Sequence, residues 1–404
     1  MTLLIKHQMI YYYVMSGSIP ENTVIGLTDE LFRQAVEDRA SDVHIEPQSD
    51  LTRIRYRVDG MLREIRDIPL KLGNAVASRI KIISEMDIGE KRLPQDGRFH
   101  LIYNERRIDL RVSTMPTIYG EKVVARILDK GNADLFNIEG IGLSPENLKQ
   151  FQRFLNRASG LLLITGPTGS GKTTTLYAAM TNLNQVGKNI VTVEDPVEYL
   201  IDGINQTQVN KKAGLTFAVS LRSILRQDPD IIMVGEIRDK ETASVAVRAA
   251  VTGHLVLATM HTNNAAGAIT RLLDMGVEPY MVASAVGLTT AQRLIRLNCP
   301  KCSREYALEE GAVDRFFLGL EPDYPVNLFK GNGCAACGYQ GYRGRVAIHE
   351  VLPATAELRR RILESEATEE AICRSGRKII NLKEDGVRKI MAGITTIEEV
   401  RRAL

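Results

Sequence analysis

The spacing of apolar positions divides the chain into two parts with different patterns. Within residues 21–130, short segments alternate apolar and polar positions, which indicates strands of a largely antiparallel sheet. Residues 28–40, with Thr28 as the expected cap, and Ala75–Met86 show helical spacing. The expected strands are Thr52–Arg57, Met61–Ile65, Arg98–Tyr103, Ile108–Ser113 and Val123–Leu128. This part is therefore predicted to be a small α+β domain.

From residue 144 onward, apolar strands and helices alternate. Ser144 and Pro145 are a typical helix start, because a cap is followed by proline at the first helical position. The expected strands are Leu161–Thr165, Ile190–Val193, Ile231–Val234 and Leu255–Thr259. The expected helices are Gly171–Leu183, Phe217–Arg226, Lys240–Val251, Ala265–Asp274 and Met281–Ile295. Such alternation implies a parallel sheet with right-handed crossovers, so residues 144–298 are predicted to form an α/β core.

The remaining segments complete the predicted domain order. Residues 1–20 are a loose lead segment with no assigned fold, and residues 131–143 are a linker. Residues 299–340 hold paired cysteines, and residues 341–404 are predicted to be a helical C-terminal region. No apolar run approaches the ~20 residues that a membrane-spanning helix needs.

One segment of the core matches a phosphate-binding motif. Gly166–Thr173 fits the pattern G-x-x-x-x-G-K-[ST], and it lies between a predicted buried strand and a predicted helix. The glycines let backbone N–H groups point inward at phosphate oxygens. Lys172 is expected to reach the β- and γ-phosphates, and Thr173 to ligate Mg²⁺. The predicted nucleotide contacts are Gly166, Pro167, Thr168, Gly169, Ser170, Gly171, Lys172, Thr173 and Thr174.

Acidic residues follow two other apolar strands of the core. Glu194 and Glu236 are expected at the carboxyl ends of their strands, where ligands bind in open α/β sheets. Hydrolysis needs one carboxylate to orient a water and another to hold Mg²⁺. His261 follows a further strand, where it is placed to sense the γ-phosphate. Arg98 and Arg111, in the first domain, are candidates for arginine fingers.

Four of the five cysteines form two C-x-x-C pairs, Cys299 with Cys302 and Cys334 with Cys337. Two such knuckles suit a tetrahedral thiolate site for one Zn²⁺. Because 31 residues separate the knuckles, an insertion is expected between them. The alternatives are two disulfides, or a redox dithiol with a spare pair. Disulfides are disfavoured if this nucleotide-binding protein lies in the reducing cytosol, as expected. Cys373 is expected to be a buried, inert thiol.

The overall composition excludes few functions. The chain has 404 residues, of which 25% are charged and 44% hydrophobic, as in ordinary globular proteins. A net charge of +3 gives no support to wholesale wrapping of nucleic acid, although a local basic face stays open.

Several motifs of this chain occur together, and in the same order, in one known family. They are Ala40–Pro47, the loop Gly166–Thr173, Val193–Glu198, Leu225–Asp230, Val234–Asp239 and Thr252–Asn263. Across about residues 21–404, this set resembles the secretion ATPases of type II secretion and type IV pilus assembly. The resemblance implies a RecA-like P-loop ATPase core with an N-terminal α+β domain of PAS-like type. The paired cysteines resemble those that mark the assembly and secretion branch of the family.

The resemblance also implies roles for single residues. Glu194 corresponds to the water-activating carboxylate, and Glu236 to the acid near Mg²⁺. Arg98 and Arg111 correspond to phosphate-contacting arginines. It further implies a cytoplasmic homohexamer, peripheral at the inner membrane, that uses ATP, Mg²⁺ and Zn²⁺. Its partner is expected to be a membrane platform protein and not a nucleic acid, and ATP turnover would rotate the two domains against each other.

Other interpretations stay open at this point. A DNA-translocating ATPase with the same core would use the cysteine element and Gly341–Arg345 as a grip on nucleic acid. A module that only switches on ATP is disfavoured by the pairing of Glu194 with Glu236. Members of the secretion branch normally carry a further N-terminal domain for docking. We therefore expect either a trimmed chain or a short member with different docking.

Overall fold

The structure, a computed structural model, describes residues 23–129, 136–309, 313–321, 324–364, 367–375 and 379–404. The chain divides into two compact units, residues 1–133 and 134–404. The predicted lead segment, residues 1–20, and the first part of the predicted linker lie outside the described residues. Ile138 and Ile141, from the second part of that linker, are buried in the core of the second unit.

The first unit is a six-stranded antiparallel sheet with the order β3-β2-β1-β6-β5-β4. Two helices cover one of its faces, because Val43, Ile45, Tyr56 and Leu110 share a buried cluster with the apolar sides of both helices. The elements are α2 (Val24–Glu37), β1 (Ala40–Pro47), β2 (Leu51–Val58), β3 (Met61–Pro69), α3 (Leu70–Ile83), β4 (Gln95–Tyr103), β5 (Arg106–Thr117) and β6 (Gly120–Asp129).

For this unit, two sequence predictions were wrong in detail and one strand was missed. Thr28 does not cap the first helix: Thr23 does, accepting a hydrogen bond from the Gly26 N–H (3.0 Å), while Thr28 is buried and donates to the Val24 carbonyl. The helix predicted at 75–86 begins and ends earlier, as α3. Strand β1 was not predicted, because nearly all its residues are buried and it therefore lacks the alternation of a half-buried strand.

The second unit is built on a seven-stranded sheet with the order β15-β12-β7-β11-β10-β8-β9. All neighbouring strands are parallel except β12 and β15. Its strands are β7 (Gly160–Thr165), β8 (Ile190–Glu194), β9 (Asn205–Gln208), β10 (Ile231–Val234), β11 (Leu255–Met260), β12 (Val286–Asn298) and β15 (Tyr342–Pro353). The four predicted core strands begin and end within a few residues of their predicted positions, which confirms the α/β core.

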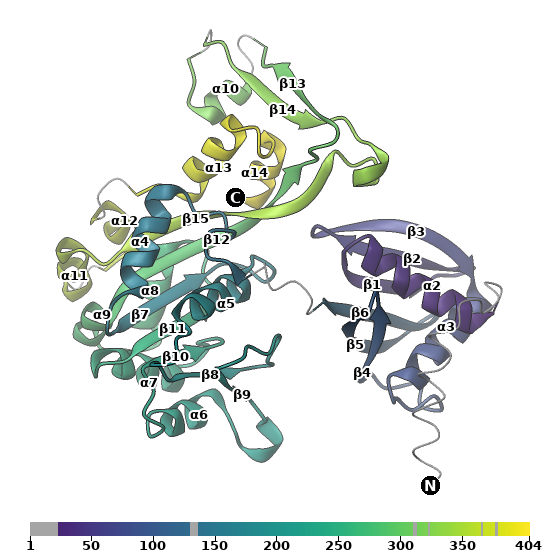
Figure 1. Ribbon diagram of the computed structural model, residues 1–404, viewed down its shortest axis with the longest axis horizontal. Coiled ribbons are helices and arrows are strands. Elements are labelled where there is room, and N and C mark those ends of the chain that lie inside the picture. The colour runs from purple at the N-terminus through teal and green to yellow at the C-terminus, as the bar shows by residue number, and fades with distance from the viewer. Residues whose placement is uncertain (1–22, 130–135, 310–312, 322–323, 365–366, 376–378) are drawn as a thin grey trace. The chain divides into compact units, whose positions relative to one another are not determined.

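Helices cover both faces of this sheet (Figure 1). One face packs against α4 (Pro145–Leu155) and α5 (Lys172–Leu183). The other packs against α6 (Phe217–Ile224), α7 (Lys240–Val251), α8 (Ala265–Asp274) and α9 (Pro279–Ala285). The strands β7, β10 and β11 are buried at every residue, as expected for parallel strands covered on both sides.

Two predictions for the second unit need correction. The segment Met281–Ile295 is not one helix, because α9 ends at Ala285 and β12 begins at Val286. Pairing with β7 on one side and β15 on the other outweighs the local helical spacing. The region 341–404 is not wholly helical either. It begins with β15, and the helices α11 (Ala356–Leu363), α12 (Glu369–Ser375), α13 (Leu382–Met391) and α14 (Ile397–Ala403) follow.

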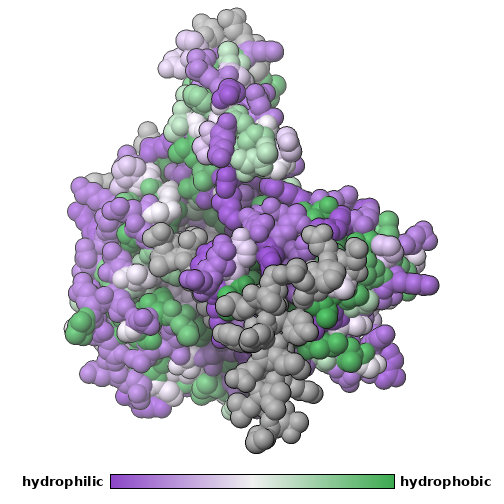
Figure 2. Space-filling model, turned by 45° about the vertical axis from the view of Figure 1, so that its right-hand side comes forward, coloured by the Kyte–Doolittle hydropathy of each residue, from purple (hydrophilic) through white to green (hydrophobic). Residues whose placement is uncertain are grey.

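An insertion lies between the two cysteine knuckles, as predicted. It contains β13 (Ser303–Ala307), α10 (Val313–Leu318) and β14 (Asn327–Gly331), and the two strands pair antiparallel. Among the described residues, no helix is long and apolar enough to cross a membrane. The face seen in Figure 2 is mostly hydrophilic, with apolar side chains scattered among polar ones.

Candidate functional site

The phosphate-binding motif forms a tight loop between β7 and α5. After Thr165 the chain turns through three glycines with positive φ, namely Gly166 (146°), Gly169 (78°) and Gly171 (87°). Residues with a side chain rarely adopt such angles, so glycine at these positions gives the loop its curvature. Helix α5 begins at Lys172, directly after the loop. Its N-terminal end therefore adds positive electrostatic potential where a phosphate would bind.

The side chain of Lys172 is buried and folds back onto the loop. Its ammonium group donates to the carbonyl oxygens of Gly166 (2.8 Å) and Pro167 (3.0 Å). Burial lowers the pKa of Lys172 to about 8, an effect that Glu236 opposes and Arg293 reinforces. The cation therefore lies inside the loop and is electrostatically linked to the neighbouring strand end that carries Glu236. Thr173 and Thr174 follow it on the first turn of α5, and Thr173 is exposed.

The ends of β10 and β11 bring two further predicted residues together. His261 Nε2 lies 3.0 Å from Glu236 Oε1, and Arg238 Nη2 lies 2.6 Å from Glu236 Oε2. Burial lowers the pKa of His261 below its ordinary value, and the Lys172 charge adds to this effect. The lowered pKa favours the neutral imidazole, whose Nε2 lies beside the Glu236 carboxylate. Lys172, Glu236 and His261 thus meet at one edge of the sheet, where ligands bind in open α/β folds.

Glu194 ends β8 in a buried hydrogen-bond network. Its Oε2 accepts from the Tyr177 hydroxyl (2.5 Å). Its Oε1 accepts from the Thr192 hydroxyl (2.6 Å) and from the Gln206 amide (3.1 Å). A carboxylate has about four acceptor positions, and these donors take three. The network fixes the orientation of the carboxylate, and burial raises the pKa of Tyr177 so that it stays a donor.

The structure adds two residues that the sequence prediction missed, both on β12. Gln292 is buried and contacts the phosphate-binding loop. Arg293 is also buried, and its Nη2 donates to the Asn263 carbonyl (2.8 Å) in the loop that carries His261. No local signal marks either residue, because their partners lie far away in the sequence. The prediction of a helix over this segment also hid their place beside the loop.

The two candidate arginine fingers lie directly opposite each other in the first unit. Arg98 on β4 pairs with Arg111 on β5, and Arg126 on β6 pairs with Arg111 from the other side. Arg98 is exposed and Arg111 half-buried. Arg126 in turn lies 3.0 Å from the buried carboxylate of Asp42. Because directly paired residues share a face, these arginines form a basic row across the sheet.

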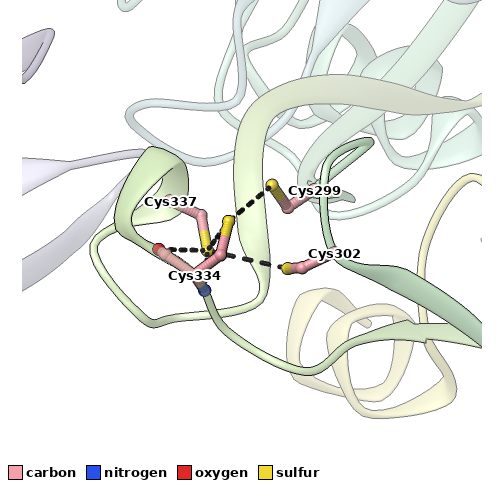
Figure 3. Close-up of side chains that lie close together, drawn as sticks. All are labelled: Cys299, Cys302, Cys334 and Cys337. Atoms are coloured by element: carbon pink, nitrogen blue, oxygen red, sulfur yellow. Dashed lines mark hydrogen bonds between the residues drawn. The ribbon is translucent and has the colours of Figure 1, made fainter.

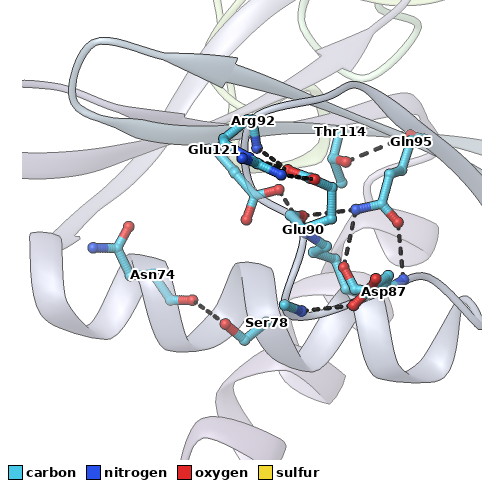
Figure 4. A network of polar contacts seen from close by, with 10 residues as sticks. Asn74, Ser78, Asp87, Glu90, Arg92, Gln95, Thr114 and Glu121 are labelled. Atoms are coloured by element: carbon cyan, nitrogen blue, oxygen red, sulfur yellow. Dashed lines mark hydrogen bonds and ion pairs between the residues drawn. The ribbon is translucent and has the colours of Figure 1, made fainter.

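The loop that leads into β4 is held by a polar network (Figure 4). The Gln95 side chain accepts from the Asp87 N–H (2.8 Å) and donates to the Glu90 carbonyl (2.9 Å). Lys81, which is buried, also donates to the Glu90 carbonyl (2.6 Å). Arg92 forms an ion pair with the Glu90 carboxylate (2.7 Å). These contacts fix the start of β4, three residues before Arg98.

The four paired cysteines converge in space (Figure 3). Their Sγ atoms lie within 4.8 Å of one another, and the distances between Cys299 and Cys334 and between Cys302 and Cys337 are both 3.9 Å. These distances exclude disulfides, whose sulfurs lie about 2.05 Å apart. They match a tetrahedral thiolate site, in which Zn–S bonds of about 2.3 Å place sulfurs about 3.8 Å apart.

Backbone donors support this arrangement of sulfurs. The N–H groups of Cys334 (3.2 Å) and Gly341 (3.3 Å) point at Cys337 Sγ. Burial acts to raise the pKa of Cys337, but these donors outweigh it and lower the pKa to about 6. Burial, with the neighbouring thiols, raises the pKa of Cys302 instead, so the case for a metal site rests on the convergence of the four sulfurs. Cys373, by contrast, is exposed, and the prediction of a buried thiol was wrong.

Similar proteins point to one family. Residues 20–402 match the family described as Type II/IV secretion system protein. The chain is 47% identical over 380 residues to Type II secretion system protein E of Pseudomonas aeruginosa, covering 94% of this chain and 75% of that protein. It is 47% identical to the Type II secretion system ATPase E of Vibrio cholerae, covering 97% and 79%. It is 46% identical to the type IV pilus assembly ATPase PilB of Myxococcus xanthus, covering 96% and 69%.

Solved structures share the fold. The ATPase DotB of Legionella pneumophila aligns with a TM-score of 0.69 at 21% identity, covering 96% of this chain and 97% of that one. The pilus retraction motor PilT aligns with a TM-score of 0.61 at 24% identity, covering 93% and 96%. The chain belongs to the type II/IV secretion system protein family and is an ATPase of that family.

The lowered pKa of Lys172 predicts how ATP affinity depends on pH. Without nucleotide, the Lys172 ammonium has a pKa of about 8, whereas a bound phosphate would raise the pKa of Lys172 and keep it protonated to higher pH. Binding above pH 8 therefore takes up a proton, and the affinity should fall by up to about tenfold per pH unit. Calorimetry between about pH 7 and about pH 9.5, in buffers of different ionisation enthalpy, measures both effects. Lys172→Arg is the control, since arginine stays protonated. An equal pH dependence in both proteins would contradict this prediction.

Proposed function

We propose that the protein is a Mg²⁺-dependent ATPase motor that works as a ring of six copies. It acts at the cytoplasmic side of the inner membrane, without spanning it, on a platform protein of a secretion or pilus assembly apparatus. The observation that carries the proposal is the meeting of Lys172, Glu236 and His261 at one sheet edge, in a chain of this family.

The residues of the sheet edge suit ATP and Mg²⁺. The loop Gly166–Thr174 would bind the phosphates, with Lys172 neutralising their charge. Mg²⁺, when bound, neutralises further phosphate charge. Thr173 and Glu236 would hold it, since hydroxyl and carboxylate oxygens are the ligands that Mg²⁺ prefers. Among the residues that the structure describes, each oxygen of Glu236 has one ion-pair partner, so acceptor positions remain for this role. His261 would respond to the γ-phosphate through its close contact with Glu236.

Glu194 is proposed as the group that orients and deprotonates the attacking water. Its three donors leave about one acceptor position on the carboxylate, and this position would receive the water. Because the donors fix its orientation in advance, little reorganisation is needed at the moment of reaction.

Arg98 and Arg111 are proposed to contact the phosphates. Like charges directly opposite each other in an antiparallel pair are unfavourable, and an anion that both groups contact offsets the repulsion. A guanidinium supplied to a transferring phosphoryl group stabilises its transition-state charge.

Cys299, Cys302, Cys334 and Cys337 are proposed to hold one structural Zn²⁺. Four thiolates complete a tetrahedral site, so the metal would stabilise the fold and take no part in hydrolysis. A DNA-translocating ATPase is the alternative function, and it is less well supported because the relatives reported above carry the names of secretion and pilus ATPases. Stimulation of ATP turnover by DNA, and not by the platform protein, would favour that alternative.

Glu194→Gln tests the proposed base. The variant keeps the shape of the side chain and its hydrogen-bond acceptor but loses the negative charge. We expect ATP binding within about twofold of the original and a fall in kcat of about 10²- to 10⁴-fold. Glu241→Gln, an exposed residue on α7, is the matched control. If Glu194→Gln binds ATP poorly but hydrolyses what it binds at the normal rate, the role proposed for Glu194 is wrong.

Arg98→Ala and Arg111→Ala test the proposed phosphate contacts. Loss of a guanidinium that stabilises the transition state should lower steady-state ATPase activity by about 10³-fold. Arg360→Ala is the control, because Arg360 makes only surface ion pairs with Glu357 and Glu364 in its described contacts. If all three variants keep the same activity, both arginines are surface residues without a role in catalysis.

Cys334→Ser tests the metal centre. Elemental analysis of the original protein should give about one zinc atom per chain. The variant should release the metal and melt at a lower temperature, because the free energy of structural metal binding contributes to folding. Cys373→Ser, which changes the exposed cysteine, should keep both the metal and the melting temperature. Metal-free original protein with reduced cysteines and full stability would exclude the zinc site.

A further inference from the structure

Strand β12 runs beside β7 and continues past the point where the phosphate-binding loop begins. Ala291 pairs with Thr165, the last residue of β7, so Gln292 lies next to the loop. The Gln292 side chain is almost wholly buried, with 1% of its surface exposed. A buried amide needs partners for both its donor and its acceptor. In the described part of the chain, its two side-chain partners are Ser170, in the phosphate-binding loop, and Thr175, on the helix that follows the loop.

The amide of Gln292 joins the loop to the helix that follows it. Its Nε2 donates to the carbonyl oxygen of Ser170 (2.7 Å), within the loop. Its Oε1 accepts from the hydroxyl of Thr175 (2.9 Å), on the first turn of α5. The backbone of Gln292 also lies close to the first residue of the loop, because a Cβ added at Gly166 would lie only 2.5 Å from the Gln292 carbonyl oxygen. One residue of β12 therefore contacts the beginning and the end of the loop.

The bond to Ser170 sets the direction of a neighbouring N–H group. The Ser170 carbonyl and the Gly171 N–H belong to one planar, trans peptide unit, so they point in opposite directions. When Gln292 draws the carbonyl toward β12, the Gly171 N–H is turned the other way. Inward-pointing N–H groups are what binds phosphate in such a loop. The contact thus acts on phosphate binding through the backbone.

We propose that Gln292 is a positioning residue that fixes the Ser170–Gly171 peptide in the orientation that binds phosphate. This inference rests on the proposed nucleotide site and adds a residue of β12 to it. An amide is required, because one end must donate and the other must accept. Glutamate at this position donates only when its carboxyl is protonated, and methionine of similar size cannot donate and accepts only weakly.

The test compares Gln292→Met with Gln292→Glu by direct binding of ATP. Gln292→Met should weaken ATP binding by about tenfold or more, at every pH from about 5.5 to about 8. Gln292→Glu should be equally weak at high pH and recover toward the original affinity on acidification. A protonated carboxyl can again donate to Ser170, and burial raises the pKa of a carboxyl. Each variant is compared with the original protein at the same pH, since ATP itself titrates. A merely structural role would not produce this recovery.

Controls separate the possible outcomes. Gln152→Met, a glutamine on α4, should bind ATP like the original protein. If Gln292→Met and Gln292→Glu fold and bind ATP normally, the inference is wrong even though the nucleotide site stands. If the original protein does not bind ATP, the proposed function itself fails.

If the Gln292 variants do not fold, Thr175→Val tests the same inference. It removes the donor that holds the acceptor end of the Gln292 amide and should weaken ATP binding by about threefold to tenfold. Unchanged ATP affinity in a folded Thr175→Val protein would overturn the inference in that case.

Discussion

The burial of one ammonium group, that of Lys172, is the constraint on which the site depends. A buried charge is costly unless it is paired or hydrogen-bonded, and here two carbonyl oxygens of its own loop accept hydrogen bonds from the ammonium group. The loop can present them because Gly166 adopts a φ of 146° and approaches β12 too closely for any side chain. The strand order then places β11 beside β7 and β10 beside β11, so that His261 and Glu236 follow strands that end at the same edge of the sheet.

Strand β12 connects this site to the rest of the second unit. Gln292 and Arg293 are neighbours on it and contact two different loops of the site. The same strand runs directly into Cys299, and the Asn298 amide donates to the carbonyls of Phe329 and Gly393 (both 3.0 Å). The cysteine cluster, β14 and the C-terminal helices therefore anchor one end of a strand whose middle supports the nucleotide site.

The sequence predicts those features that have local signals. The core strands are continuous apolar runs between turn residues, and the loop motif fixes the place of Lys172. What escapes prediction depends on distant contacts. Strand β12 is recognisable only from its partners, and Gln292 contacts Ser170 across 122 residues. Thr23 and Thr28 are equally good caps by residue type, so local sequence could not choose between them. The exposure of Cys373 likewise depends on tertiary packing.

Steady-state phosphate release by the original protein and by Lys172→Ala, with ATP and Mg²⁺, tests the central claim most directly. Alanine removes the buried cation but leaves the glycines, the strand edge and the cysteine cluster in place. The account predicts turnover by the original protein and its loss in the variant, with both proteins melting at similar temperatures. Equal turnover by a folded Lys172→Ala protein would contradict it.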